Sequence, residues 1–442
     1  MISKWLPRVL MAWGAALLVF FYGFQVARQH RFPYNSIVKA VDQVKDIRSR
    51  LQGNPGGNYI KSDVTQTVIL HRPAEMAPGM TLVVGVGPKG YLYGSLIDAD
   101  GRREHTWDLD WYHIWPNPTH IPSAMKPKDR PGTDVHGIWM SRNGDLTFNY
   151  NNLGMVQVDV CGRVKWRLPH LTHHSVDQDE AGNFWAGDLI IRDKPDPGLP
   201  NYMPVFNDNG IVVVSPNGQL LRRISVFDLL KQNHLQGLLY MSAMAHSDTT
   251  VCCDMLHEND VEVFKSTMKP DLFQPGDVMV SLRNLNTVLV FDPKTMRIKQ
   301  LLVGHTVRQH DPDFLDGSTI SVFDNNNVGK PQDQGSSRII EYSFKTGQEK
   351  VLFQGVPATP FYTNEGGKQQ RLANGNLLLN EMTRGRALEV TPRGELVWEY
   401  FNHADKGLLG ALGEAYRVAP DYMSVADLKR LTAQCPAAPA HG

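Results

Sequence analysis

The sequence has no excess of either charge. Among its 442 residues, lysine plus arginine number 45 and aspartate plus glutamate number 45, so the formal net charge at pH 7 is zero. This balance argues against a general nucleic-acid binder, which needs a basic excess over its binding face. The hydrophobic share of 42% argues against a disordered, charged tail protein. The chain is long enough for three ordinary domains or for one large repeat architecture.

Cysteine is scarce as well. The chain has four cysteines, which are too few for a disulfide scaffold, and it has no Cys-x-x-Cys motif, so we expect no cysteine-based zinc site. A bond between the adjacent Cys252 and Cys253 would be strained. Pairing that involves Cys161 or Cys435 is possible, but the spacing leaves the pairing open.

Long hydrophobic runs are missing except for one, the uncharged stretch Val9–Phe24. Lys4 and Arg8 precede it, and a buried core helix fits poorly at an N-terminus beside basic residues. A cleaved signal peptide and an uncleaved signal anchor both fit. We favour the anchor because no small-x-small cleavage site follows the run. We therefore predict a membrane-anchored protein whose main domain is extracytoplasmic, on the periplasmic side of the inner membrane if the source is bacterial.

Glycine turns recur through the body of the chain, where helical periodicity is nearly absent and short β-branched and aromatic runs prevail. Turns of a first kind lie at residues 143–146, 181–184, 275–278, 316–319 and 374–377. Turns of a second kind lie at residues 100–101, 161–162, 217–218, 294–295, 346–347 and 393–394. Six turns of the second kind imply six units of roughly 50 residues, the size of a four-stranded propeller blade. The predicted fold is all-β, a six-bladed β-propeller, with a β-sandwich array as the alternative.

The segments that flank the repeats have other patterns. Hydrophobic spacing predicts a helix over Ser36–Leu51, with a glycine-rich linker after it. Ser424 and Asp427 predict a capped helix over Ser424–Thr432, before a tail that we expect to be disordered. The predicted segments are a signal anchor or transmembrane helix at 1–30, a helical stalk and linker at 31–58, the propeller at 59–402, and a C-terminal extension at 403–442.

Four of the 16 histidines fall at the same place in successive units. Each stands at the head of the first strand, seven or eight residues before the glycine of the first turn, or nineteen where an insertion at 265–273 intervenes. Because the first strand of a propeller blade lines the central channel, we expect these side chains to converge at the channel mouth. The four are His136, His174, His257 and His310. We treat the remaining histidines as surface or packing residues, with His173 and His305 the least certain.

Three other polar residues lie near these strand heads. Asn259 shares a strand face with His257, Arg283 lies in the second strand of the same unit, and Thr383 follows the second strand of the last unit. Clustered imidazoles suit two chemistries. They bind zinc, copper or iron, or an imidazole nitrogen attacks phosphorus or sulfur while an arginine offsets the charge on the oxygens.

Several blocks of the repeat region resemble the bacterial aryl-sulfate sulfotransferase family. They are Leu256–Val261 with Val280–Asn286, Arg308–Leu315 with Val322–Asn325, Thr172–Asp177, and Arg371–Asn376 through Leu388–Trp398. The likeness covers residues from about 80 to 402. It implies a six-bladed propeller that moves a sulfuryl group from a phenolic sulfate ester to another phenol or hydroxyl acceptor. The transfer would pass through a sulfated histidine, without the nucleotide donor PAPS and without a metal or other cofactor.

The resemblance also implies roles for individual residues. The implied catalytic residues are His310 as the nucleophile, with His257, Arg283 and His174. The substrate-binding residues are Asn259, Thr383 and, from its register, His136. The expected partners are an aryl sulfate donor, a phenolic acceptor and a membrane around the N-terminal helix, with no nucleic acid. Two other functions stay open. One is a calcium-dependent propeller hydrolase that uses Asn259, Asp260, Glu258 and Asp311 as oxygen ligands, and the other is a non-catalytic anchored propeller that binds a glycan or a protein.

Overall fold

The computed structural model describes residues 5–28, 57–123, 125–241, 251–329 and 335–436. The chain divides into two compact units, Met1–Gly57 and Asn58–Gly442. The stalk helix predicted over residues 36–51 and the tail beyond residue 436 lie outside the described residues.

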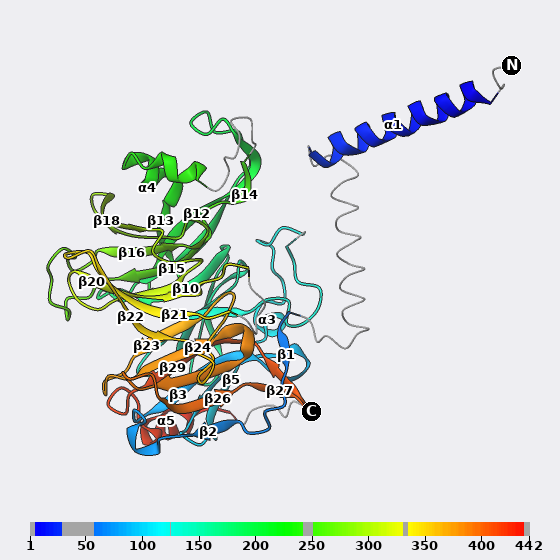
Figure 1. Ribbon diagram of the computed structural model, residues 1–442. Coiled ribbons are helices and arrows are strands. Elements are labelled where there is room, and N and C mark those ends of the chain that lie inside the picture. The colour runs from blue at the N-terminus through cyan, green and yellow to red at the C-terminus, as the bar shows by residue number, and fades with distance from the viewer. Residues whose placement is uncertain (1–4, 29–56, 124, 242–250, 330–334, 437–442) are drawn as a thin grey trace. The chain divides into compact units, whose positions relative to one another are not determined.

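The described part of the first unit is helix α1, which spans Leu6–Arg28 (Figure 1). Its stretch Pro7–Val26 is 20 residues long with a mean hydropathy of 1.8. At a rise of about 1.5 Å per residue, 20 helical residues span about 30 Å, the thickness of the hydrocarbon core of a bilayer. The predicted apolar N-terminal helix is therefore confirmed. Its length and composition satisfy the requirements of a membrane anchor and equally those of a signal sequence.

The second unit is all-β, as predicted, and its described residues form six sheets of four or five strands (Figure 1). The first sheet contains β29 (Leu412–Val418), β3 (Met80–Val86), β4 (Leu92–Ile97) and β5 (Arg103–Asp108). The second contains β6 (Val135–Met140), β7 (Leu146–Tyr150), β8 (Gly154–Val158) and β9 (Val164–Leu168). The third contains β10 (Thr172–Gln178), β11 (Phe184–Arg192), β12 (Tyr202–Val214) and β13 (Leu220–Ser225), with β14 (Val251–Asp254) parallel to β12.

The remaining sheets follow in chain order. The fourth contains β15 (Glu258–Val263), β16 (Val278–Leu282), β17 (Thr287–Asp292) and β18 (Arg297–Val303). The fifth contains β19 (His310–Phe314), β20 (Thr319–Asp324), β21 (Arg338–Ser343) and β22 (Gln348–Gln354). The sixth contains β23 (Lys368–Arg371), β24 (Leu377–Glu381), β25 (Arg386–Val390), β26 (Leu396–Phe401) and β2 (Val68–Leu70). A small extra sheet joins β1 (Tyr59–Lys61), β28 (Leu408–Gly410) and β27 (His403–Asp405), and the short helices are α3 (Trp111–Ile114), α4 (Val226–Gln232) and α5 (Val425–Thr432).

Both kinds of predicted glycine turn lie where hairpins form. The first kind joins the first two strands of a sheet, as at Gly144 between β6 and β7, and the second kind joins the last two, as at Gly162 between β8 and β9. Gly144 has a φ of +81° and Gly162 a φ of +78°, a conformation in which a Cβ atom is unfavourable. The turns therefore fix the strand order because their residues suit the backbone that the hairpins need.

One strand from each sheet contacts a strand of the next sheet, and we call these six the leading strands. β29 contacts β6, β6 contacts β10, β10 contacts β15, β15 contacts β19, and β19 contacts β23, which in turn contacts β29. Four of the six, β6, β10, β15 and β19, contain or directly follow one of the four registered histidines. The consequence for function is that residues at the heads of neighbouring leading strands lie close together.

The predicted C-terminal boundary at residue 402 is wrong. Strand β29 lies beyond it and pairs with β3 in an antiparallel register, so the end of the chain completes the sheet that the start of the unit begins. Helix α5 after it begins at the predicted capping box of Ser424 and Asp427. A disulfide between Cys161 and Cys435 then ties this end of the chain to the turn between β8 and β9.

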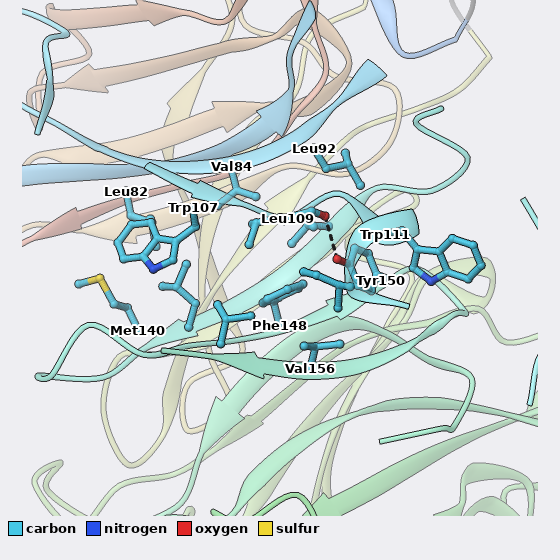
Figure 2. Close-up of a cluster of buried hydrophobic side chains, with 14 of the residues drawn as sticks. Leu82, Val84, Leu92, Trp107, Leu109, Trp111, Met140, Phe148, Tyr150 and Val156 are labelled. Atoms are coloured by element: carbon cyan, nitrogen blue, oxygen red, sulfur yellow. Dashed lines mark hydrogen bonds between the residues drawn. The ribbon is translucent and has the colours of Figure 1, made fainter. Parts of the chain in front are cut away.

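Buried apolar side chains fill the space between neighbouring sheets (Figure 2). Leu82 of β3, Trp107 of β5 and Phe148 of β7 belong to one cluster, and none is more than 1% exposed. The hydroxyl group of Tyr150 donates to the carbonyl oxygen of Leu109 at 2.8 Å within the same layer. Strands that are buried on both faces explain why the runs in the sequence are continuous rather than alternating. This packing makes a rigid base for the heads of the leading strands.

Candidate active site

The heads of four leading strands share a local distortion. Each pairing of the first strand with the second shifts register there, between Val135 and Ile138 in β6, His173 and Val176 in β10, Glu258 and Asp260 in β15, and His310 and Asp313 in β19. Each irregular segment holds or adjoins a residue with positive φ, at Gly137, His174, His257 and Asp311. β-Bulges of this kind redirect side chains at the end of a strand. Left-handed backbone at two histidines is a strained arrangement of the sort that functional sites retain.

These bulges bring the four registered histidines together. The ring centroids of His136 and His174 lie 4.6 Å apart, and those of His174 and His257 lie 5.3 Å apart. The ring of His310 lies 6.5 Å from His136 and 6.5 Å from His174. His136, His174 and His310 are buried, whereas the side chain of His257 is 27% exposed. Four imidazoles from four different sheets therefore form one cluster, and His257 is the member most open to solvent.

The hydrogen bonds of His310 determine which of its ring nitrogens carries the proton. Nδ1 lies 2.6 Å from Oδ1 of Asn325. The Asn325 amide nitrogen donates to the carbonyl oxygens of Thr363 and Gly366 at 3.0 and 2.8 Å, so its Oδ1 can only accept. The proton therefore sits on Nδ1 and the lone pair on Nε2, where the backbone N–H of Gly366 donates at 3.2 Å. Burial lowers the pKa of His310 well below its usual value, which keeps the ring neutral.

His257 has a carboxylate partner instead. Its Nδ1 lies 2.5 Å from Oδ2 of Asp254 in β14, and its backbone N–H donates to the other carboxylate oxygen at 3.2 Å. Burial alone would raise the pKa of Asp254, but the hydrogen bond and the charge of His257 outweigh it and hold that pKa below the ordinary value. An ionised carboxylate beside Nδ1 fixes the orientation of the ring. Nε2 is then the nitrogen with which a bound ligand would exchange a proton.

Arg283 supplies positive charge to the same place. It follows β16, and its backbone N–H donates to the carbonyl oxygen of His257 at 3.0 Å. Its Nε is buried without a hydrogen-bond partner among the described residues, and no acidic side chain described here pairs with its guanidinium. Burial, followed by repulsion from Arg308, lowers the pKa of Arg283 below its ordinary value. A desolvated and unpaired guanidinium is suited to an anionic ligand. The negative charge of that ligand would offset both the cost of burial and the repulsion from Arg308.

Asn259 and Thr383, both predicted to bind substrate, have partners within the protein. Asn259 is 2% exposed, and its amide nitrogen donates to the carbonyl oxygen of Gln309 at 2.8 Å, which ties β15 to the residue before His310. The Thr383 hydroxyl donates to Oδ1 of Asn364 at 3.0 Å. These contacts hold Gln309, which precedes His310, and Asn364, which lies two residues before Gly366. The buried Oδ1 of Asn259 is without a hydrogen-bond partner among the described residues.

A second layer stands behind His174. The Nδ1 atoms of His173 and His174 lie 2.8 Å apart, and Nδ1 of His173 lies 3.7 Å from Oε2 of Glu258. Burial lowers the pKa of His173 to about 3 and that of His174 well below its usual value, and burial raises the pKa of Glu258 well above its own. The interpretation of His173 as a surface or packing residue is thus incomplete, because it contacts a histidine of the cluster. His305, by contrast, is 39% exposed and pairs with Glu349.

Two of the carboxylates that a calcium site would use, Asp311 and Asp260, pair with a lysine, whereas both carboxylate oxygens of Glu258 are buried without a hydrogen-bond partner among the described residues. Nζ of Lys368 lies 2.6 Å from Oδ1 of Asp311 and 3.4 Å from Oδ1 of Asp260. Burial raises the pKa of Asp260 to about 7 and that of Glu414 to about 8. The ammonium group of Lys368 lies between these two carboxylates, where a bound cation would have to lie. Within the described ranges, no group of three or more His, Cys, Asp or Glu side chains has the arrangement of a metal site.

Comparison with known proteins then identifies the family. A sequence model of the arylsulfotransferase (ASST) family matches residues 145–403, which is more than half of the 442 residues. The chain belongs to the arylsulfotransferase family. The matched range includes His174, His257, Arg283 and His310, and membership supports an arylsulfotransferase-type activity in general. The resemblance found in the sequence is therefore confirmed. No curated protein matches the chain.

Solved structures that match the chain are remote in sequence. A protein of unknown function from Bacteroides caccae is 12% identical, covers 77% of this chain and 100% of its own, and superposes with a TM-score of 0.45. A streptogramin B lyase is 10% identical, with coverages of 78% and 87% and a TM-score of 0.39. An inactive virginiamycin B lyase from Staphylococcus aureus with quinupristin is 12% identical, with coverages of 77% and 87% and a TM-score of 0.38.

Two contributors to the cluster were missed by the sequence interpretation. Asp254 lies three residues before His257, but its position on β14 of a neighbouring sheet depends on the tertiary fold. Asn325 lies within a block of family likeness and received no role, because nothing in its local sequence indicates that its side chain meets His310. The adjacent pair of His173 and His174 was the one local signal that a second layer existed.

Proposed function

We propose that the protein is a PAPS-independent sulfotransferase that moves a sulfuryl group from an aryl sulfate ester to a phenolic or other hydroxyl acceptor through a sulfated His310. The observation that carries the proposal is the tautomer of His310. A neutral imidazole with its proton held on Nδ1 and its lone pair on Nε2 is a ready nucleophile. It stands in a cluster with three other histidines and near the unpaired charge of Arg283, in a chain of the arylsulfotransferase family.

In the first half-reaction, the hydrogen bond from the Gly366 N–H to Nε2 of His310 is released, Nε2 attacks the sulfur atom, and the bond from sulfur to the aryl oxygen breaks. The electron pair of that bond leaves on the phenolate oxygen, which takes a proton from Nε2 of protonated His257. Arg283 offsets the negative charge on the sulfuryl oxygens as they pass through the transition state. His257 suits the acid role better than His174, because its Nδ1 contacts the carboxylate of Asp254, whereas the Nδ1 of His174 faces the neutral His173.

The second half-reaction reverses the roles. The neutral His257 takes the proton of the acceptor hydroxyl, the acceptor oxygen attacks sulfur, and the bond from sulfur to Nε2 of His310 breaks. The ring of His310 returns to its starting tautomer, because its proton stays on Nδ1 throughout, where it is hydrogen-bonded to the amide oxygen of Asn325. The His136 ring, 4.6 Å from His174, would line the same pocket and contact substrate.

The proposed fold is a closed six-bladed propeller, and the proposed site lies in an extracytoplasmic, membrane-anchored protein. Closure is supported by the leading strands, whose sequence of contacts returns from β23 to β29 and on to β6. An extracytoplasmic location is supported by the disulfide between Cys161 and Cys435, since such bonds persist in oxidising compartments. Helix α1 would supply the anchor.

The proposal is tested by assaying the purified protein with a chromogenic aryl sulfate and a phenol acceptor. The substitution His310→Ala should lower the rate of transfer at least about 10³-fold, as loss of a nucleophile does. His305→Ala serves as the matched control, because His305 is exposed and pairs with Glu349, which is not part of the histidine cluster. Transfer at the unsubstituted rate by His310→Ala would overturn the assignment.

A further inference from the structure

We propose that Asn325 is a positioning residue for sulfuryl transfer: its uncharged amide oxygen holds the proton on Nδ1 of His310 and keeps the sulfated ring a good leaving group. The inference rests on the proposed function. It goes further in assigning the chemical character of the partner on Nδ1. Asn325 follows β20 directly, is 0% exposed and has an Oδ1 atom 2.6 Å from Nδ1 of His310.

The orientation of the Asn325 amide is fixed by the chain that leads into the last sheet. Its nitrogen donates to the carbonyl oxygens of Thr363 and Gly366, so the group cannot rotate to present a donor to the imidazole. Gly366 belongs to both arrangements, because its N–H donates to Nε2 of the same ring. Asn325 thereby holds His310 from the Nδ1 side and also holds the backbone that meets the Nε2 side.

Other buried asparagines of the second strands show which part of this arrangement is structural. Asn149 of β7 donates to the carbonyl oxygens of residues 173–175, and Asn380 of β24 donates to that of Leu412. Each therefore braces the head of the next leading strand, as Asn325 braces the segment before β23. The Oδ1 atoms of Asn149 and Asn380 are buried without a hydrogen-bond partner among the described residues, whereas that of Asn325 accepts from an imidazole. All three asparagines thus brace a neighbouring backbone segment through the amide nitrogen. Among them, Asn325 also contacts a histidine of the cluster, through its amide oxygen.

The uncharged character of the amide has a chemical consequence. When Nε2 bonds to sulfur, the ring becomes an imidazolium whose Nδ1 proton remains hydrogen-bonded to Asn325. An amide oxygen is far too weak a base to remove that proton, so the bond from Nε2 to sulfur stays easy to break when an acceptor oxygen attacks. A carboxylate at the same place is a far stronger base than an amide oxygen and would take the Nδ1 proton of the sulfated ring, which the electron-withdrawing sulfuryl group makes more acidic. The neutral sulfated imidazole that results would release its sulfuryl group more slowly.

The site has both kinds of partner, one on each of two histidines. His257 has the carboxylate of Asp254 on Nδ1, which suits a residue that must gain and lose a proton. His310 has the amide of Asn325 on Nδ1, which suits a residue that must gain and lose a sulfuryl group while keeping its proton. The difference in partner therefore separates the acid-base histidine from the covalent one.

The inference is tested with the full chain by following each half-reaction separately. After mixing with an aryl sulfate alone, quenched samples give the rate at which the His310 peptide gains a sulfuryl group, and a chase with phenol gives the rate of its loss. Asn325→Ala should slow the gain about tenfold or more with little change in KM, because Nδ1 loses its acceptor. Asn325→Asp should retain or speed the gain and slow the loss, so that sulfated protein accumulates at steady state.

Asn380→Ala and Asn380→Asp are the matched controls, because they remove the same kind of bracing contact without touching His310. Equal effects of the Asn325 and Asn380 substitutions on the two half-reactions would overturn the inference, as would unchanged rates in both Asn325 variants. If the unsubstituted protein never becomes sulfated, the proposed function itself fails. If it does and the variants match it, only the role of Asn325 fails.

A measurement on the unsubstituted protein keeps the inference open to refutation even if the variants do not fold. Nitrogen-15 NMR of histidine-labelled protein, with His310 assigned by its loss in His310→Gln, reports which ring nitrogen bears the proton. We expect a neutral ring with the proton on Nδ1. A proton on Nε2 would overturn the inference.

Discussion

The Oδ2 atom of Asp254 lies 2.5 Å from Nδ1 of His257, and the same carboxylate accepts from the backbone N–H of that histidine. One side chain therefore holds both the backbone of His257 and the ring that we assign to proton transfer. Asp254 comes from β14, which pairs with β12 of the third sheet, whereas His257 immediately precedes β15 of the fourth. The acid-base pair thus depends on how two sheets meet.

The loss of rate on removing the Asp254 charge should depend on the leaving group of the donor. We expect Asp254→Asn to slow desulfation of unsubstituted phenyl sulfate by about 10²-fold or more, because its phenolate needs a proton as it leaves. Nitrophenyl sulfate, whose phenolate is a better leaving group, should be slowed much less. The measurement is kcat/KM for a series of phenyl sulfates. Asp108→Asn alters a comparable Asp–His pair with the exposed His113. It should change neither kcat/KM nor its dependence on the leaving group of the donor. An equal loss for every donor would contradict the assignment of His257 as the acid.

The guanidinium of Arg283 should be needed for its shape as well as its charge. Arg283→Met is expected to lower kcat/KM about 10²- to 10³-fold, which is typical for loss of one transition-state donor. Arg283→Lys should recover only part of it, since an ammonium group lacks the planar fork that fits a sulfuryl group. Steady-state kinetics provide the measurement, with Arg163→Met as the control because Arg163 is an exposed partner of Asp159. Full activity in Arg283→Lys would show that point charge alone suffices.

Buried acids should make stability fall as the pH rises above neutrality. The pKa of Glu414 is raised to about 8 by burial, from an ordinary value of 4.5. The folded chain therefore keeps a proton that the unfolded chain has already released, and stability is lost as the pH rises through the folded pKa. His173, whose pKa burial lowers to about 3, acts in the opposite direction only below about pH 6.5.

Thermal denaturation between pH 6.5 and 8.5 measures this effect. We expect Tm to fall across that window and expect Glu414→Gln, which mimics the protonated group, to flatten the decline. Glu349→Gln is the control, because Glu349 pairs on the surface with His305. A decline that is equally steep in the protein and in Glu414→Gln would contradict the assignment of the proton to Glu414.

The disulfide should stabilise the fold through its long span. Cys161 and Cys435 are separated by 274 positions, and closing so long a loop restricts the unfolded chain by an amount typically worth about 2–5 kcal/mol. Tm should fall by several degrees when reductant is added. The double substitution Cys161→Ser and Cys435→Ser should give the lower Tm at once and be insensitive to reductant. A Tm of the untreated protein that equals that of the double variant would show that the bond contributes nothing.

The sequence indicated those features that depend on short stretches of chain. Glycine turns such as the one at Gly144 report the hairpins because the backbone conformation is local. The register of His136, His174, His257 and His310 was visible because the units repeat, so one spatial position recurs at one sequence position. The sequence also revealed the apolar helix α1 and the capping box of α5, both of which are local patterns.

Features that join distant parts of the chain could not be read in this way. Strand β29 lies more than 300 residues from its partner β3, and nothing in its own residues identifies that partner. The pairing of Cys161 with Cys435 depends on the same return of the chain. Asn325 and Asp254 become part of the site only through the bulges and loops that turn His310 and His257 toward them.

The most direct test of the central claim is mass spectrometry of the protein after a brief pulse of aryl sulfate with no acceptor present. We expect the peptide that contains His310 to gain the mass of one sulfuryl group, and to lose it when phenol is added. His310→Ala should remain unmodified under the same conditions. Sulfation of a different residue, or turnover of the donor with no protein-bound sulfuryl group at any time, would contradict transfer through His310.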